Sequence, residues 1–208
     1  MQRKVKWTIY VAIITVLIVV SKVGAETVEV ENSRSPDGKL SLRVRGPEEG
    51  EPLDAAWRLR LEVVAGGKVV ASYDYHGYAK YPYNAKSDNL SVLWSPSSKN
   101  FALMIRTTKR SWQIFVFSLD GKKLEPILLP SAIEIALGML GVKEDFRVFR
   151  ERPDKWTNED TLVVRTRGDA QLGGAFIWYE IDITYSISKK AIIASKLVSK
   201  KPFRGDEF

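Results

Sequence analysis

The chain of 208 residues contains no cysteine and a single histidine, and these absences remove several kinds of chemistry. Without cysteine there is no disulfide, no thiolate nucleophile or metal ligand, and no residue to carry the lipid of a lipoprotein. The only histidine, His76, cannot form a multi-histidine zinc site. The sequence therefore predicts no catalytic residue, no metal site and no cofactor, and a fold held by packing and hydrogen bonds alone.

Enzyme signatures are missing as well. The chain has no Gly-x-Ser-x-Gly nucleophile elbow, and residues 64–68 (VAGGK) lack the spacing of a phosphate-binding loop. The acids Glu48, Glu49 and Glu51 do not follow the pattern of a calcium loop. A non-catalytic protein is favoured. A hydrolase with its site in the loop 73–83 remains the alternative, because a histidine can activate a nucleophile that lies close in space.

The first 25 residues have the three parts of a secretory signal peptide. A basic start (Arg3, Lys4, Lys6) precedes an apolar run over 7–20 and the small-residue exit 23–25 (VGA). We predict cleavage after Ala25 and a periplasmic or secreted product with no stable membrane span. An uncut anchor is the alternative, although the run is shorter than the roughly 20 residues that a span needs.

Removal of this segment would leave little net charge. Four of the 32 basic residues lie in it and none of the 25 acidic ones does, which leaves 28 against 25. Nucleic-acid binding normally leaves a concentrated basic footprint, so no nucleic-acid partner is predicted. The remaining length suits a single β-rich domain over 26–200, followed by a polar tail over 201–208.

Apolar and polar residues alternate along most of the chain, as in strands with one buried face. Strands are predicted over 57–64, 69–76, 101–107, 111–118, 175–187 and 191–198, with turns between them. One helix is predicted near 131–140, because Ser131 and Glu134 form a capping box and Gly141 is a plausible stop. The fold class expected is all-β and mostly antiparallel with one short helix.

A weak internal repeat recurs about every 60 residues. Residues 35–39 (SPDGK), 94–99 (WSPSSK) and 156–160 (WTNED) each precede an alternating strand. The clearest unit, 94–123, ends in Asp-Gly-Lys and resembles the TolB-like or WD40-like propeller blade of exported bacterial proteins. That resemblance implies about three blade-like sheets, too few for a closed ring. A β-sandwich-like single domain is the alternative. Trp94 is predicted to be buried with its indole N–H bonded.

The segment 73–83 (YDYHGYAKYPY) carries five tyrosines in eleven residues. Tyrosine suits interfaces because it buries much area at low entropy cost and keeps a hydroxyl. A protein or cell-envelope component is the expected partner, and the expected contact residues are Tyr75, His76, Tyr78, Tyr81 and Tyr83. The alternative is that these rings pack on the protein's own sheet.

A second cluster contains the outward positions of two neighbouring strands, namely Arg43, Arg45, Arg58 and Arg60. Like charges opposite each other destabilise a sheet, so a ladder with Glu29, Glu31 and Glu62 is expected. An anionic ligand at these arginines is the alternative.

Overall fold

The computed structural model describes residues 27–45, 58–76, 90–108, 110–142 and 149–203. This part of the chain is built mostly from strands, with one helix, as the sequence predicted. The elements are β1 (Thr27–Glu29), β2 (Leu40–Arg45), β3 (Arg58–Ala65), β4 (Lys68–His76), β5 (Leu90–Trp94), β6 (Asn100–Arg106), β7 (Ser111–Asp120), β8 (Lys123–Ile127), α1 (Ala132–Leu140), β9 (Phe149–Trp156), β10 (Thr161–Leu172), β11 (Ala175–Ser186) and β12 (Ala191–Pro202).

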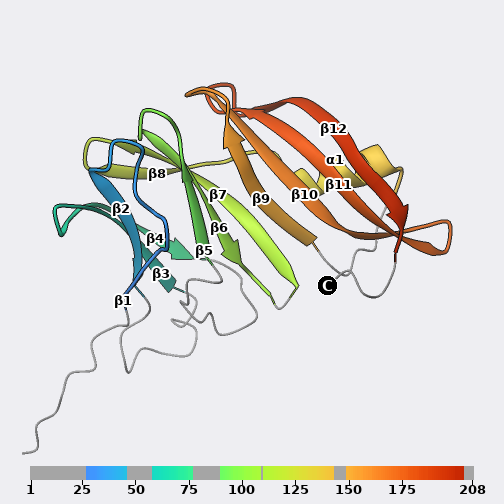
Figure 1. Ribbon diagram of the computed structural model, residues 1–208, viewed down its shortest axis with the longest axis horizontal. Coiled ribbons are helices and arrows are strands. Elements are labelled where there is room, and N and C mark those ends of the chain that lie inside the picture. Colours follow the sequence, from blue (N-terminus) through green and yellow to red (C-terminus); the bar gives the residue numbers. More distant parts are fainter. Residues whose placement is uncertain (1–26, 46–57, 77–89, 109, 143–148, 204–208) are drawn as a thin grey trace, which may run out of the picture.

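The strands form three successive groups, β1–β4, β5–β8 and β9–β12, in each of which neighbours along the chain pair antiparallel. The groups follow one another from left to right in Figure 1. The first is a separate sheet, whereas the second and third share one sheet. They are joined by a short parallel pairing of β7 with β9, in which Ser111 lies opposite Phe149 and Trp112 opposite Arg150. That the groups are propeller blades stays a prediction.

The turns that open the first two groups use the same chemistry. The Ser35 hydroxyl accepts a hydrogen bond from Leu40 N (3.0 Å), and the Ser95 hydroxyl accepts one from Asn100 N (3.1 Å). Gly38 and its counterpart Ser98 both have a left-handed backbone, with φ of 71° and 62°. The 60-residue spacing therefore corresponds to a repeated local structure in these two turns.

One tryptophan connects the second group to the first, and another connects the third group to the second. Trp94 is 6% exposed and donates its indole N–H to the carbonyl of Ser33 at 2.7 Å, which confirms the prediction. Trp156 donates in the same way to the carbonyl of Leu93 at 3.0 Å. These bonds fix successive groups at matching positions of the repeat.

The two faces of the middle group, β5–β8, pack into two different hydrophobic clusters. Phe101, Leu103 and Ile105 are buried against the first sheet. Ile114 packs against the cluster of the third group and Phe115 against that of the first, so the two face opposite ways as alternation requires.

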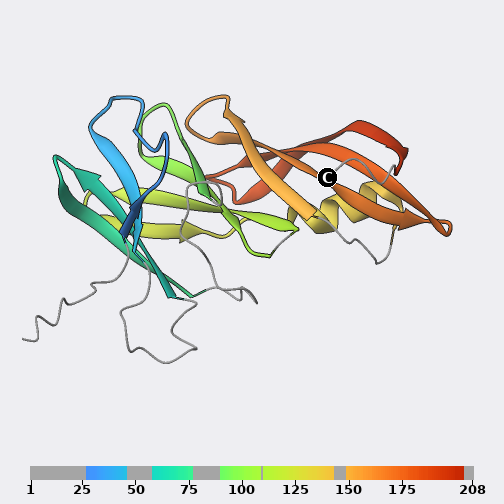
Figure 2. The ribbon, with the colours of Figure 1, turned by 60° about the horizontal axis from the view of Figure 1, so that its bottom comes forward.

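Helix α1 covers one face of the third group, as Figure 2 shows. Its buried residues, Ala132, Ala136 and Leu140, belong to the cluster formed by β10 and β11. Ser131 accepts from Glu134 N at 3.4 Å and Gly141 ends the helix in the left-handed conformation, so the Ser131 half of the predicted capping box and the predicted stop are present. No helix within the described ranges is long and apolar enough to cross a membrane.

Candidate functional site

Most of the predicted tyrosine site lies outside the described residues. Tyr73 is half-buried in β4, with its ring centroid 5.3 Å from that of Phe117, so this ring belongs to the core. The backbones of Tyr75 and His76 pair in β4, opposite Leu59 and Arg58, but their side chains are not described. Tyr78, Tyr81 and Tyr83 lie in the undescribed range 77–89. Their role in binding stays a prediction.

Two arginines of the first sheet, Arg43 and Arg60, belong to a charge ladder. Arg43 Nε lies 2.5 Å from the carboxylate of Glu62, which is 5% exposed, and Arg60 Nε lies 3.9 Å from the same carboxylate. Arg60 also faces Asp74 at 3.9 Å, a partner that was not predicted from the sequence. Glu29 is opposite Arg43 in register. This network accounts for Arg43 and Arg60 without a ligand.

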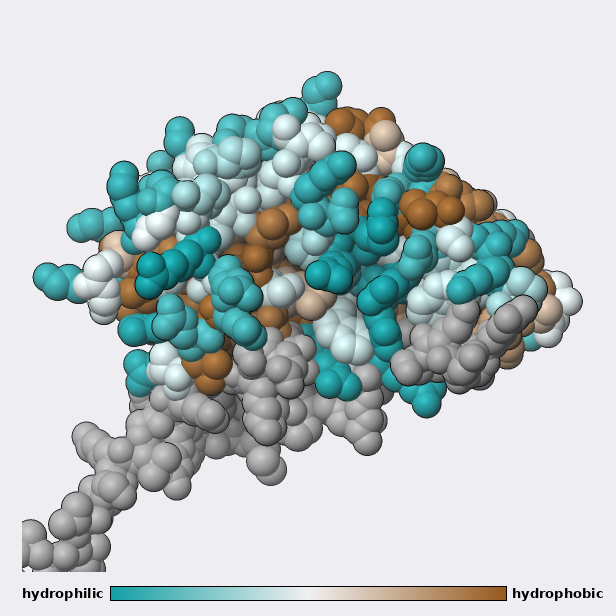
Figure 3. Space-filling view, in the orientation of Figure 1, coloured by the Kyte–Doolittle hydropathy of each residue, from teal (hydrophilic) through white to brown (hydrophobic). Residues whose placement is uncertain are grey.

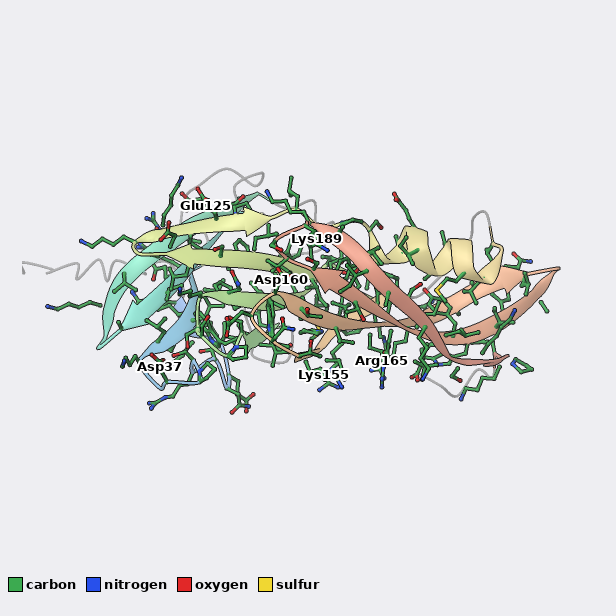
Figure 4. All side chains as sticks on the ribbon, turned by 90° about the horizontal axis from the view of Figure 1, so that it is seen from above. Asp37, Glu125, Lys155, Asp160, Arg165 and Lys189 are labelled. Carbon is green, nitrogen blue, oxygen red and sulfur yellow. The ribbon has the colours of Figure 1, made fainter. Side chains whose placement is uncertain are left out.

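A second basic surface, which we call the arginine face, lies on the third group opposite α1. Figure 4 shows Arg165 and Lys155 on this side of the sheet. One continuous row across five strands contains Arg106, Trp112, Arg150, Arg167 and Glu180. The next row contains Arg152, Arg165, Asp182 and Lys196. Figure 3 looks onto this face and shows hydrophilic side chains over β9 and β10.

Trp112 holds two of these arginines at the join between the second and third groups. The guanidinium carbon of Arg106 lies 5.0 Å from the Trp112 ring centroid, and that of Arg150 lies 4.6 Å from it. Because their strands flank β7, the ring stands between the two cations. Cation–π contacts fix the guanidinium groups without neutralising their charge.

Arg150 lies in an unfavourable electrostatic environment. Its Nε is buried and has no hydrogen-bond partner within the described residues. The pKa of Arg150 is lowered, first because burial removes water from the guanidinium and then because Arg167 and Arg106 place positive charge beside it. An added anion would relieve both costs.

One acid of this face, Asp182, is bound to an arginine of the second row. Arg165 binds Asp182 through two bonds, Nε–Oδ1 at 2.8 Å and Nη2–Oδ2 at 3.0 Å, and this contact raises the pKa of Arg165. Asp169, further along the same face of β10, is fully buried. Glu180, opposite Arg167 in register, is the remaining acid of the row. Arg167 and Arg106 nevertheless place positive charge beside Arg150.

On the α1 side of the third group, a cavity of about 230 Å³ lies between β7, β8, β10 and the segment that leads into α1. Its lining is mostly apolar and includes Ile114, Ile127, Leu129 and Val164. One carboxyl group, that of Glu151, reaches it and accepts a hydrogen bond from Ile114 N at 2.8 Å. Burial raises the pKa of Glu151 to about 7, against the opposing effect of the Ile114 bond.

Further polar groups surround Glu151. Thr166 lies directly opposite it in register, and Thr166 Oγ1 and the Tyr179 hydroxyl are buried with no hydrogen-bond partner among the described residues. Burial raises the pKa of Tyr179 to about 12. Tyr185, in contrast, donates its hydroxyl to the carbonyl of Pro130 at 3.1 Å. The third group thus contains buried hydroxyl groups with and without a hydrogen-bond partner among the described residues.

The two tyrosines give a matched pair of variants. Tyr179→Phe removes a buried hydroxyl that has no partner, so unfolding should cost about 1 kcal/mol more than in the wild type. Tyr185→Phe removes a bonded hydroxyl and leaves the Pro130 carbonyl without it, so stability should fall by about 1 kcal/mol. Denaturant melts measure both. Equal losses in the two variants would contradict this assignment.

The arginine face has a signal in the sequence that was not among the predicted sites. Arg150 and Arg152 alternate along one strand and Arg165 and Arg167 along the next, the same pattern that singled out the ladder of the first sheet. Alternation puts each pair on one face, but only the register of β9 with β10 makes them neighbours. The chain matches no protein-family model, and no curated protein matches it.

Proposed function

We propose that the protein is an exported, non-catalytic binding protein that attaches to an anionic component of the cell envelope through the arginine face. Export rests on the signal-like segment 1–25. The observation that carries the binding proposal is the buried, unpartnered Nε of Arg150 between Trp112 and Arg167 within the described strands. An oxyanion there supplies both the missing acceptor and the missing negative charge.

Phosphate-bearing lipid is the envelope component that this surface suits best. The face is a broad part of a sheet, with arginines on the neighbouring strands β9 and β10 and Lys196 on β12, rather than a narrow groove. Each basic residue near an anionic bilayer contributes about 1 kcal/mol, and this attraction falls off within a Debye length. Guanidinium groups bind phosphate oxygens through paired N–H donors.

Vesicle binding tests the proposal. Purified protein should bind vesicles that contain phosphatidylglycerol and should not bind vesicles of phosphatidylcholine alone. The double variant Arg150→Gln/Arg167→Gln should bind about 30-fold more weakly, because two contributions of about 1 kcal/mol are lost. Added salt should weaken wild-type binding.

The control is Lys68→Gln/Lys99→Gln, which removes the same charge from exposed positions in the first two groups. It should retain most of the binding. Equal loss in both double variants would show that net charge alone is responsible. Tighter binding to a DNA duplex than to the vesicles would contradict an envelope role. Melting temperatures establish that each variant is folded.

A further inference from the structure

The cavity beside Glu151 exists because β7 has two partners on one edge. Strand β8 pairs with the far end of β7, from Val116 to Asp120, and β9 pairs with its beginning, at Ser111 and Trp112. Between them, Ile114 N donates to the side chain of Glu151. A carboxylate thus stands where the carbonyl of a neighbouring strand would normally be, and the opening beside it is the 230 Å³ cavity.

The carboxyl group has unused hydrogen-bonding capacity. An ionised carboxylate offers about four acceptor sites, and Ile114 N is its one hydrogen-bond donor within the described residues. The other polar side chains of the lining are engaged elsewhere. The Ser131 hydroxyl caps α1, and the Tyr185 hydroxyl donates to Pro130. A ligand in this cavity therefore meets apolar walls and one strong acceptor.

No basic side chain lines the cavity within the part of the chain that the structure describes. The titratable groups that face Glu151 are Tyr179 and Tyr185 of β11, which it affects electrostatically. On α1 the acid Glu134 is exposed. Strands β7, β8 and β10 contribute only uncharged side chains to the lining. The ligand charge that complements this site is positive.

We infer that this cavity binds an amphiphilic amine, whose ammonium group donates to the Glu151 carboxylate while its apolar body packs against Ile127, Leu129 and Val164. The volume is that of roughly eight water molecules at about 30 Å³ each, below the range of about 300–1,000 Å³ for drug-sized ligands. It therefore suits a short alkyl or aryl chain. On β9 and β10 the site lies on the opposite face from the arginines, and it does not depend on the function proposed above.

The ionisation of Glu151 gives the interaction a pH dependence. An alkylammonium keeps its proton up to a pH near 10, whereas the pKa of Glu151 is about 7. Bound ammonium favours the carboxylate, so binding should strengthen as the pH rises from 5.5 to 8. Since few molecules carry the carboxylate at pH 5.5, the expected gain in affinity is more than about tenfold.

Titrations with n-hexylamine and 1-hexanol, which share an apolar chain, test the inference on the purified protein. The shift of the Ile114 amide proton in NMR spectra is a local readout, because this N–H bonds Glu151. At pH 8 the amine should bind at least about tenfold more tightly than the alcohol, since its bond is charge-assisted. Equal affinities, or tighter binding of hexanoate, would overturn the inference.

Two variants separate the charge from the cavity. Glu151→Gln keeps an acceptor for Ile114 N but cannot ionise, so it should lose the preference for the amine and the pH dependence while binding 1-hexanol as before. Ala132→Met fills the space beside a buried lining residue and should weaken both probes. Undiminished amine binding in either folded variant would place the amine elsewhere. Because vesicle binding is measured separately, its failure would leave this result unaffected.

Discussion

Replacing Trp94 by alanine should lower the free energy of unfolding by about 3–5 kcal/mol, the range for a large aromatic side chain in a packed core. Trp94 is 6% exposed, and its ring centroid lies 4.7 Å from that of Phe101. Phe101 in turn stacks on Phe117 at 5.3 Å. The substitution leaves a cavity at this stack and removes the donor to the Ser33 carbonyl, so the first two groups lose both packing and a hydrogen bond. Denaturant melts measure the change.

Trp94→Phe is the matched control for the hydrogen bond. It keeps an aromatic ring but loses the indole N–H, and a buried acceptor without its donor costs about 1–3 kcal/mol. The phenylalanine variant should therefore lie between the wild type and the alanine variant. A loss below about 1 kcal/mol in Trp94→Ala would show that the tryptophan does not join the two groups.

The stability of the folded protein should fall by up to about 3 kcal/mol through Glu151 as the pH rises from about 4.5 to 7. Burial raises the pKa of this carboxyl to about 7 from its ordinary value of 4.5. Below the ordinary value both states are protonated, and the contribution of Glu151 is fully present. Between the two values the unfolded chain releases its proton first, so unfolding becomes easier. Above about 7 both states are ionised and the loss is complete.

Glu151→Gln isolates this effect from other carboxyl groups. Asp37, Glu125 and Asp160 have lowered pKa values through their hydrogen bonds, so their contributions change in the opposite direction, at lower pH. The difference in unfolding free energy between wild type and Glu151→Gln should therefore favour the wild type most at the acidic end of the window. A difference that does not change between pH 4.5 and 7 would contradict a raised pKa at this residue.

Local patterns in the sequence were enough to predict most secondary-structure elements. Alternation predicted the hairpin of β3 and β4 and the long strands β11 and β12, because burial of one face selects every second residue. The capping residues Ser131 and Gly141 predicted α1, since they satisfy backbone groups within a few residues. The recurring turn sequence also predicted the buried, bonded Trp94. The signal segment, the tyrosine contacts and the blade assignment remain predictions.

The candidate sites depended on contacts between segments far apart in the chain. Alternation in the sequence places the arginines of each strand on one face. Only the pairing of β9 with β7 and β10 places Arg150 between Trp112 and Arg167. At the same junction, Ile114 N donates to the carboxylate of Glu151, and the cavity lies beside this bond. The physical reason is the distance along the sequence over which each kind of signal acts. Strand and helix signals act between residues a few positions apart, whereas strand register across a junction follows from how whole sheets pack. The sequence by itself determined most of the elements and their turns, and the tertiary structure decided which charges meet.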